Sequence, residues 1–134
     1  MVEQRNAYKG SPPRPWMRAI LVAADGTTRS LDLLADTGNP CAVVVAGGVL
    51  RDFNVGVAPG MSTNFGALDG GWLRVQIPEL EFDEDVLAYG SDAVVEAALS
   101  SHEDFSGLAG LPLLRMMEYG GDRNSFWLRA AGSK

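Results

Sequence analysis

The sequence predicts an all-β protein with one or two short helices. Short apolar, β-branched runs recur along the chain, and Asp-Gly and Gly-Gly pairs separate them as turn signals. The 16 glycines among 134 residues are consistent with many tight turns. At this length we expect one domain with a sizeable core, not two independent lobes.

The first strands flank a hairpin turn at Asp25-Gly26. Residues 17–24 and 27–35 are strand-like on either side of that pair, which is a strong hairpin signal. Further strands are expected at residues 41–45, 72–77, 86–89 and 125–130.

The segments between these strands are expected to be irregular. Gly47-Gly48 should end the third strand, and residues 54–71, rich in Gly, Asn, Ser and Thr, should form a mobile loop or hairpin tip. The acidic run at residues 79–85 is typical of a solvated turn.

Two short helices are expected in the second half of the chain. The first follows a capping Ser-Asp pair and runs from Ala93 to Leu99. The second runs from Pro112, where a missing N–H is tolerated, to Tyr119, before a Gly-Gly stop.

The first 15 residues differ in composition from the rest. Residues 10–15 read Gly-Ser-Pro-Pro-Arg-Pro, which cannot form a helix and favours extended conformations. We therefore expect a flexible N-terminal arm over residues 1–15 and a folded domain over residues 16–134.

The charge and apolar patterns exclude several classes of partner. A net charge of −6 with no basic stripe argues against nucleic acid or an anionic membrane as the main partner. No apolar run approaches the roughly 18 residues of a membrane span, and the first ten residues are polar. We expect a cytoplasmic protein.

No metal or cofactor is expected. The single cysteine, Cys41, excludes an internal disulfide and a cysteine-based metal site, and a buried thiol is the expectation for it. The lone histidine, His102, lies in a polar context typical of a solvated loop. The acidic run lacks the glycine and the regular ligand spacing of a calcium loop.

The tripeptide Asp36-Thr37-Gly38 is where the sequence indicates chemistry. It follows the apolar run at residues 31–35, so a strand delivers a carboxylate to a tight, hydrogen-bonded turn at the edge of the core. A carboxylate held rigidly in such a place suits acid–base catalysis. The alternative is an ordinary strand-to-turn signal, in which Asp36 only caps backbone N–H groups.

The order of the elements resembles the retropepsin-like (clan AA) aspartic proteases over about residues 16–130. Residues 33–38, Leu-Leu-Ala-Asp-Thr-Gly, are similar to the active-site signature of that family. Residues 108–114, Leu-Ala-Gly-Leu-Pro-Leu-Leu, are similar to its later apolar-apolar-Gly segment and helix. The resemblance implies a closed acid-protease barrel in a single lobe and an aspartic endopeptidase activity.

In that family, two carboxylates that share one proton serve as base and acid. This chain offers one aspartate in the required context, because none of Asp25, Asp69 and Asp122 combines an apolar lead-in with a following Thr-Gly. The resemblance therefore implies a symmetric homodimer that hydrolyses a peptide or protein substrate through two copies of Asp36.

The resemblance also assigns supporting roles. Residues expected to support the active site are Thr37, Gly38, Asn39, Leu108, Ala109 and Gly110. A flap over about residues 60–72 would close on the substrate, with candidate residues Asn64, Phe65, Gly66, Gly70 and Gly71. The aromatic end at residues 126–128 would lie in the dimer interface.

The sequence departs from the family at two points. The family usually has Ala, Ser or Thr where this chain has Asn39, a position that influences hydrogen bonding within the catalytic pair. The helix expected from Ala93 is an insertion relative to a minimal retropepsin, and the sequence gives it no function.

Two alternatives to a protease stay open. One is a catalytically silent β-barrel binding module on the same fold. The other follows from Gly38-Asn39-Pro40, which resembles a turn of diaminopimelate-epimerase-like and phenazine-biosynthesis-type enzymes. Those folds are longer, and the epimerases use a pair of cysteines, whereas this chain has one.

Overall fold

The computed structural model describes residues 2–64, 66–99 and 105–132, so Phe65 and His102 lie outside the described residues. The elements in chain order are β1 (Glu3–Ala7), β2 (Trp16–Val22), β3 (Thr28–Asp36), β4 (Val43–Val45), α1 (Gly47–Phe53), β5 (Asn54–Thr63), β6 (Gly66–Ile77), the 3₁₀ helix η1 (Pro78–Leu80), β7 (Phe82–Gly90), α2 (Asp92–Leu99), β8 (Gly107–Gly110), α3 (Leu111–Leu114), β9 (Glu118–Gly121) and β10 (Ser125–Arg129).

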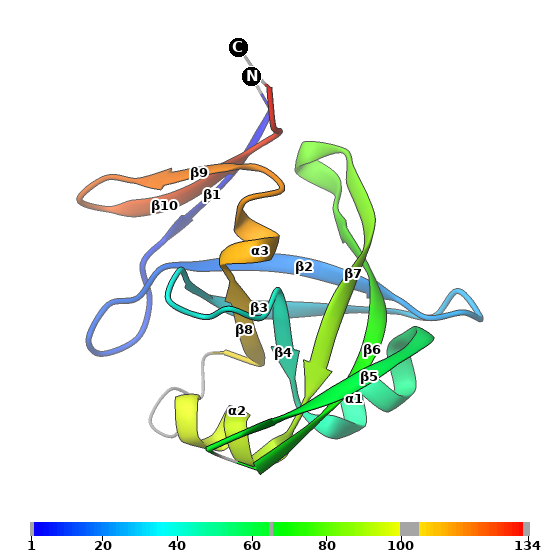
Figure 1. Ribbon diagram of the computed structural model, residues 1–134. Helices are drawn as coiled ribbons and strands as arrows, with labels where there is room; N and C mark the ends of the chain where they lie inside the picture. Colours follow the sequence, from blue (N-terminus) through cyan, green and yellow to red (C-terminus); the bar gives the residue numbers. More distant parts are fainter. Residues whose placement is uncertain (1, 65, 100–104, 133–134) are drawn as a thin grey trace.

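Six strands close into a barrel (Figure 1). The order is β2-β3-β8-β4-β7-β6, β6 pairs back to β2, and β5 adds to the outer side of β6. The pairs β3–β8 and β4–β7 are parallel, and the other pairs in this sheet are antiparallel. The closed all-β barrel expected from the sequence is confirmed.

The barrel interior is filled by alternate residues of its strands. Along β2 and β6, every second side chain points inward, as the period of a strand requires. The residues of these two strands with no exposed surface are Met17, Ala19, Leu21, Leu73, Val75 and Ile77. Burial of their apolar surface is the main force that holds the barrel closed.

The hairpin predicted at Asp25-Gly26 connects β2 and β3. Gly26 has a φ of +90°, a conformation that side chains with a Cβ rarely adopt. The carboxylate of Asp25 accepts a hydrogen bond of 2.9 Å from the backbone N–H of Thr27. Local turn chemistry therefore fixes the register that brings β3 to its end at Asp36.

A helix, α1, follows β4 where Gly47-Gly48 were expected only to end a strand. Its three buried residues, Val49, Leu50 and Phe53, share one face and pack into the main core. Packing of that face outweighs the low helix propensity of two glycines, because tertiary burial supplies most helical stability.

The helix expected from Pro112 to Tyr119 is much shorter than predicted. α3 ends at Leu114, and Tyr119 belongs to β9, where it is paired with Leu128 of β10. Pairing with β10 satisfies backbone groups that a longer helix would have satisfied internally. The helix expected from Ala93 to Leu99 is α2, which begins one residue earlier, at Asp92.

The expectation of a flexible arm over residues 1–15 is wrong for β1, which pairs with β10 along its whole length. Gln4 is buried, donates to the carbonyl oxygen of Arg18 at 2.9 Å and accepts from the Arg18 N–H at 2.7 Å. These bonds join β1 to β2. The proline content of residues 10–15 gave no information about the strand before them.

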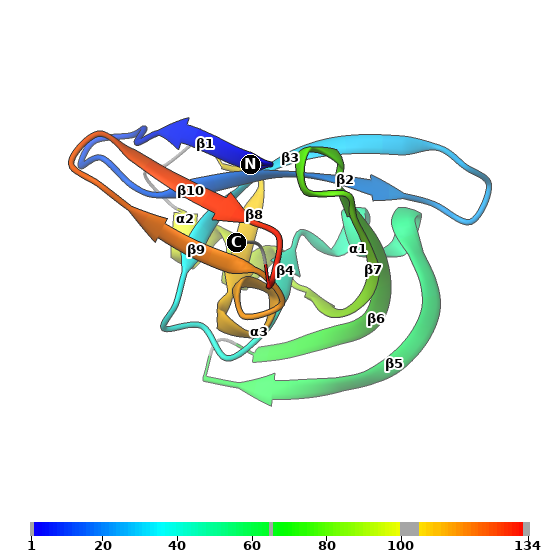
Figure 2. The ribbon, with the colours of Figure 1, turned by 90° about the horizontal axis from the view of Figure 1, so that it is seen from above.

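The terminal strands form a second sheet in the order β1-β10-β9, which lies across one end of the barrel (Figure 2). Phe126 and Leu128 are buried in the core of their own chain, so their burial does not require a partner subunit, and a place for residues 126–128 in a dimer interface stays a prediction. Trp127 lies on the opposite face of β10, with the Arg129 guanidinium 3.9 Å from its ring centre.

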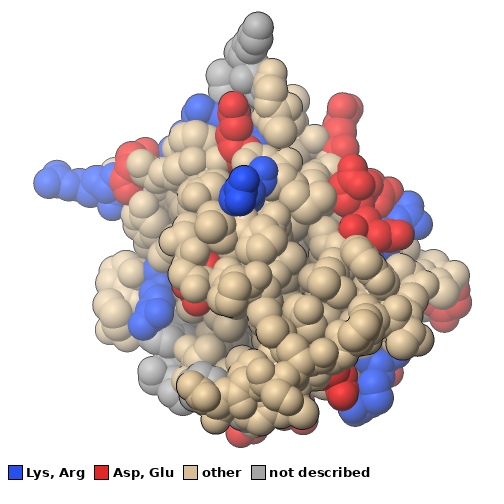
Figure 3. All heavy atoms as spheres, in the orientation of Figure 1, with Lys and Arg blue, Asp and Glu red and all other residues tan. Residues whose placement is uncertain are grey.

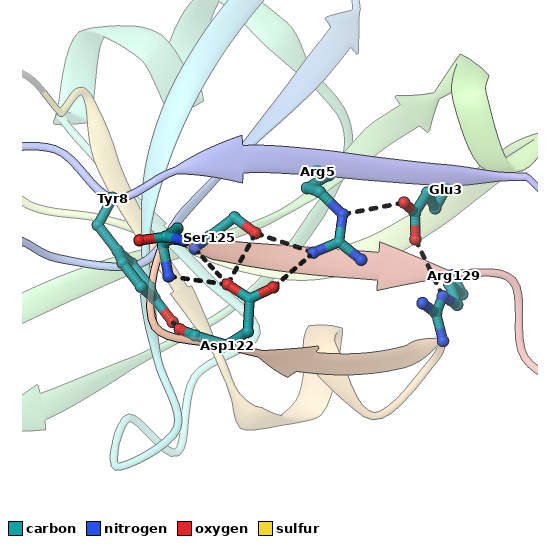
Figure 4. Close-up of polar contacts among 7 residues, drawn as sticks. Glu3, Arg5, Tyr8, Asp122, Ser125 and Arg129 are labelled. Carbon is teal, nitrogen blue, oxygen red and sulfur yellow. Dashed lines mark hydrogen bonds and ion pairs between the residues drawn. The ribbon is translucent and has the colours of Figure 1, made fainter.

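Ion pairs tie the outer face of this sheet together (Figure 4). The Arg5 guanidinium donates to Glu3 at 3.0 Å and to Asp122 at 3.1 Å, and Arg129 donates to Glu3 at 3.0 Å. Asp122 also accepts from the backbone N–H of Ser125 at 2.8 Å. The network links β1 and β10 to the β9–β10 turn.

The region expected as a mobile loop or hairpin tip, residues 54–71, is a long hairpin, with strands where a loop was the alternative. β5 and β6 pair from Asn54 to Thr63, with irregular register on either side of residues 56–58, and the turn lies between Thr63 and Gly66. Gly66 has a φ of +107°, which accounts for glycine at the tip. The glycines elsewhere in the segment lie within strands.

Most of the acidic run expected as a solvated turn belongs instead to β7. Its Asp83 carboxylate accepts hydrogen bonds from Arg74 of β6 at 2.8 and 2.9 Å, and from Gln76 at 3.2 Å. The Arg74 bonds, followed by the Gln76 bond, lower the pKa of Asp83 from its ordinary 3.8 to about 2.

This lowered pKa predicts a pH effect on stability. Because the folded-state value lies below the unfolded one, the contribution of Asp83 is present above about pH 4 and is lost as pH falls toward 2. In Asp83→Asn, the decline of the melting temperature over that window should be shallower than in the parent. The difference should be small and shrink with salt, since the pair is exposed. Glu84→Gln, an exposed neighbour on β7, is the matched control and should follow the parent curve.

Acidic side chains gather at the upper right of the face shown in Figure 3, over the turn between β6 and β7. The centre of the same face is largely free of charged side chains (Figure 3). Among the described residues, none of the helices is both long enough and apolar enough to cross a membrane.

Candidate active site

Asp36 is the last residue of β3 and lies half-buried at the end of the barrel. β3 is held between β2 and β8, and its buried residues Leu31 and Leu33 anchor it in the core. The strand therefore carries the carboxylate to a fixed position at the edge of the apolar interior, as the sequence predicted.

The turn after Asp36 is closed by hydrogen bonds in which backbone N–H groups donate to side-chain and carbonyl oxygens of the same turn. Asp36 Oδ1 accepts from the Gly38 N–H at 3.1 Å, and its carbonyl accepts from the Asn39 N–H at 3.1 Å. Asn39 Oδ1 then accepts from the Cys41 N–H at 2.9 Å. Thr37 is exposed at the turn. The side-chain amide of Asn39 thus stabilises the bend over residues 39–41, which explains why a polar residue stands at position 39.

β8 brings the second predicted motif beside the first. Leu108, Ala109 and Gly110 pair in parallel with the last residues of β3, and Gly110 lies opposite Asp36. The Leu111 N–H donates to the Asn39 carbonyl at 3.1 Å. A methyl group on Gly110 would overlap the carbonyl oxygen of Cys41, so only glycine permits this approach.

A cavity of about 370 Å³ opens beside Asp36. One side is the turn itself with the barrel strands beneath it, formed by Asp36, Asn39, Pro40, Cys41, Val44 and Leu108. The other side comes from the β5–β6 hairpin and from α2, and is formed by Met61, Thr63, Asn64, Leu68, Val94 and Ala98. In Figure 1 the hairpin tip and α2 both lie at the lower end of the barrel.

The residues predicted for the flap lie in two places, at the tip of the β5–β6 hairpin and farther along β6. Asn64 borders the cavity, and Gly66 begins β6 at the hairpin turn. Gly70 and Gly71 are not at the tip: they lie farther along β6, paired with Ala58 and Val57. Gly70 allows close contact between strands, since a Cβ there would overlap backbone atoms of β5. Phe65 lies outside the described residues.

Cys41 is buried and faces the hairpin, with its Sγ 3.9 Å from Met61 Sδ. Burial raises the pKa of its thiol. A buried thiol of raised pKa is a poor nucleophile, as the sequence led us to expect. Its contact with Met61 instead connects the Asp36 turn to the hairpin that covers it.

Apart from Asn64, sequence reasoning missed the residues that the hairpin and α2 contribute to the cavity. Met61 and Leu68 lie within the segment expected to be a mobile loop or hairpin tip, where the sequence assigned no face to its apolar residues. Val94 and Ala98 are four residues apart, so they share one side of α2, and this spacing was the available signal. Within the described parts of the chain, His, Cys, Asp and Glu side chains form no cluster of three that could hold a metal ion.

No family model matches this sequence, and no curated protein matches it. Among solved structures, it is similar to a retropepsin-like aspartic protease from Rickettsia conorii, with a TM-score of 0.58 and 13% identity over 96% of this chain and 92% of that one. The chain has a retropepsin-like fold. The EIAV protease complexed with the inhibitor HBY-793 also aligns, with a TM-score of 0.47 and 12% identity over 80% of this chain and 90% of that one.

The retropepsin-like fold confirms the resemblance read from the two motifs. In this chain the fold joins Asp36, at the end of β3, to Gly110, at the end of β8, across adjacent strands. These positions are separated by more than seventy residues in sequence. The fold also places the β5–β6 hairpin and α2 along the other side of the cavity, and neither element belongs to the two motifs.

Proposed function

We propose that this chain is an aspartic endopeptidase that works as a symmetric homodimer, with Asp36 of each protomer forming the catalytic pair. The observation that carries the proposal is the position of Asp36: a carboxylate held by a braced turn at the mouth of an apolar cavity, beside Gly110. The retropepsin-like fold supports it.

The arrangement accounts for the chemistry of amide hydrolysis. One oxygen of Asp36 is fixed by the Gly38 N–H, while the other accepts no hydrogen bond from the described residues. Two such carboxylates meeting at a two-fold axis cannot both be ionised, so the pair holds one proton. The ionised member takes a proton from water, and the protonated member donates one to the substrate.

A second copy is needed because the other candidate aspartates are engaged elsewhere. Asp25 caps the β2–β3 turn, and Asp122 caps the β9–β10 turn while bonding to Arg5. Asp69 is in β6, opposite Gly90 of β7. Asp36 is the one carboxylate that borders the cavity among the residues described. A symmetric dimer would supply the missing carboxylate with the same residue.

The substrate would be an extended peptide bound beneath the β5–β6 hairpin. An extended chain uses its backbone N–H and C=O groups to pair with strand edges, and its side chains enter pockets. In this proposal the hairpin tip is the flap, and it closes over the peptide to exclude water that is not part of the reaction. Thr37 and Gly38 would then lie at the contact between the two turns.

The test is cleavage of a mixed peptide library from acidic to neutral pH, followed by mass spectrometry of the products. We expect internal cleavage by the parent and none by Asp36→Asn prepared identically, a control for contaminating proteases. Equal cleavage by both proteins would rule out Asp36 as the catalytic residue. Binding of peptides without any cleavage by the parent would favour the silent binding module instead.

A further inference from the structure

Helix α2 covers the cavity although the proposed chemistry does not require it. It is inserted between β7 and β8, two strands of the barrel, and contributes Val94 and Ala98 to the cavity wall. On the same helix, Leu99 is buried with Leu34 and Leu108 in a cluster that adjoins the cavity, and Val94 and Val95 pack against that cluster. One face of the helix therefore packs on the barrel, and part of that face is left for a ligand.

The side of the cavity opposite the Asp36 turn is formed by the β5–β6 hairpin and by α2, and these two elements are held differently. Met61 and Leu68 belong to the β5–β6 hairpin, which the proposed mechanism opens and closes. The start of α2 is fixed to the barrel: Ser91 Oγ caps the Val94 N–H at 3.2 Å, the Ser91 N–H donates to Val45, and Asp92 Oδ1 accepts from Gly47 at 2.9 Å. α2 is thus anchored at its start by bonds that do not involve the β5–β6 hairpin.

The chemistry of the lining selects against charge. Apart from the Asp36 carboxylate and the thiol of Cys41, the described residues that line the cavity have apolar or neutral polar side chains. Away from Asp36, a charged substrate side chain would lose its hydration there without gaining a partner among the described lining residues. An apolar side chain would replace water against Val94, Ala98 and their neighbours, with a gain proportional to the area buried.

We propose that α2 is the specificity-determining element of this site, and that Val94 and Ala98 admit an apolar substrate side chain and limit its size. The proposal rests on the proposed function, since it names the substrates of the same cavity. Ala98 is the critical position, because alanine leaves space that any larger residue on this anchored helix would occupy.

The experiment compares Ala98→Leu with Ala97→Leu. Ala97 is the next residue on α2, is exposed and does not border the cavity, so it is a matched control. The probes are short blocked peptides that differ at one central residue: Ala, Leu, Phe, Asp or Lys. Binding is measured by isothermal titration calorimetry on an Asp36→Asn background, so that hydrolysis does not interfere, and cleavage is measured separately with Asp36 intact.

We expect the unmodified cavity to bind the Leu and Phe peptides more tightly than the Asp and Lys peptides. Ala98→Leu should weaken binding of the Phe peptide by about tenfold or more, because a pocket discriminates by at least this factor per added methylene. Binding of the Ala peptide should change little, and Ala97→Leu should leave the whole profile unchanged. Identical profiles for the two variants would overturn the proposal, as would absence of binding by every peptide.

Val94→Ala is a second variant that works in the opposite direction. It enlarges the cavity, so the ratio of Phe to Leu binding should rise, and this result supports the proposal even if Ala98→Leu fails to fold. An unchanged ratio in a folded Val94→Ala protein would contradict it. If the peptides bind with the expected preference but the protein with Asp36 cleaves none, the proposed hydrolysis fails while the role of α2 stands.

Discussion

Replacing Asp36 by Asn should abolish peptide hydrolysis while leaving the fold intact. The amide can still accept the hydrogen bond from the Gly38 N–H that closes the turn, so the melting temperature should change little. The amide cannot take up or release the proton that the reaction moves. We expect the rate to fall by about 10²–10⁴-fold or more, the range that positioned acid–base groups contribute.

Mixing the two proteins tests whether the site needs two copies. With about three parts of Asp36→Asn to one part of parent, random pairing leaves only about a quarter of parent subunits with a parent partner. Peptidase activity should therefore fall to about a quarter of what the same parent gives alone. Activity that does not respond to the variant would mean that one chain suffices. Activity per subunit should also rise with protein concentration, because dilution separates dimers.

Gly110→Ala should be among the most destabilising single substitutions in this chain. The added methyl would overlap the Cys41 carbonyl oxygen and crowd the Asn39 carbonyl oxygen, and both atoms belong to backbone that cannot move aside cheaply. β8 would have to shift away from the Asp36 turn. We expect a loss of about 3 kcal/mol or more in the free energy of unfolding, the upper part of the range for overpacking.

Urea unfolding measures this loss, and Gly48→Ala is the control. A methyl on Gly48, in α1, would meet only the end of the Arg51 side chain at 3.5 Å. That variant should be unchanged or more stable by about 0.5–1 kcal/mol, because alanine favours a helix over glycine. A Gly110→Ala protein as stable as the parent would show that β8 does not depend on the close approach.

Features that depend on neighbours in the chain were predictable from the sequence. The Asp25-Gly26 hairpin was found because a tight turn favours a hydrogen-bonding residue followed by a glycine that can take a positive φ. The same reasoning located the turn after β3, where an apolar strand ends in a hydrogen-bonding carboxylate. The motif around Gly110 was found by resemblance to a family, and its physical requirement became visible only beside the Cys41 carbonyl.

Features that depend on distant partners were not predictable in this way. Residues 115–119 follow a helical pattern, but the backbone of Tyr119 pairs with Leu128 instead. β1 lies beside a proline-rich segment and is a strand because β10 offers its edge. α1 forms over two glycines because Phe53 and its neighbours have a core to pack against.

The candidate site shows the same division. By itself the sequence determined that Asp36 ends a buried strand in a rigid turn and that the chain holds one such aspartate, because strand pattern and turn chemistry are local properties. The tertiary structure alone decided that Met61, Val94 and Ala98 meet around that carboxylate. Their meeting depends on the closure of the barrel and on the pairing of strands far apart in sequence, and no local pattern encodes which distant surfaces will be buried together.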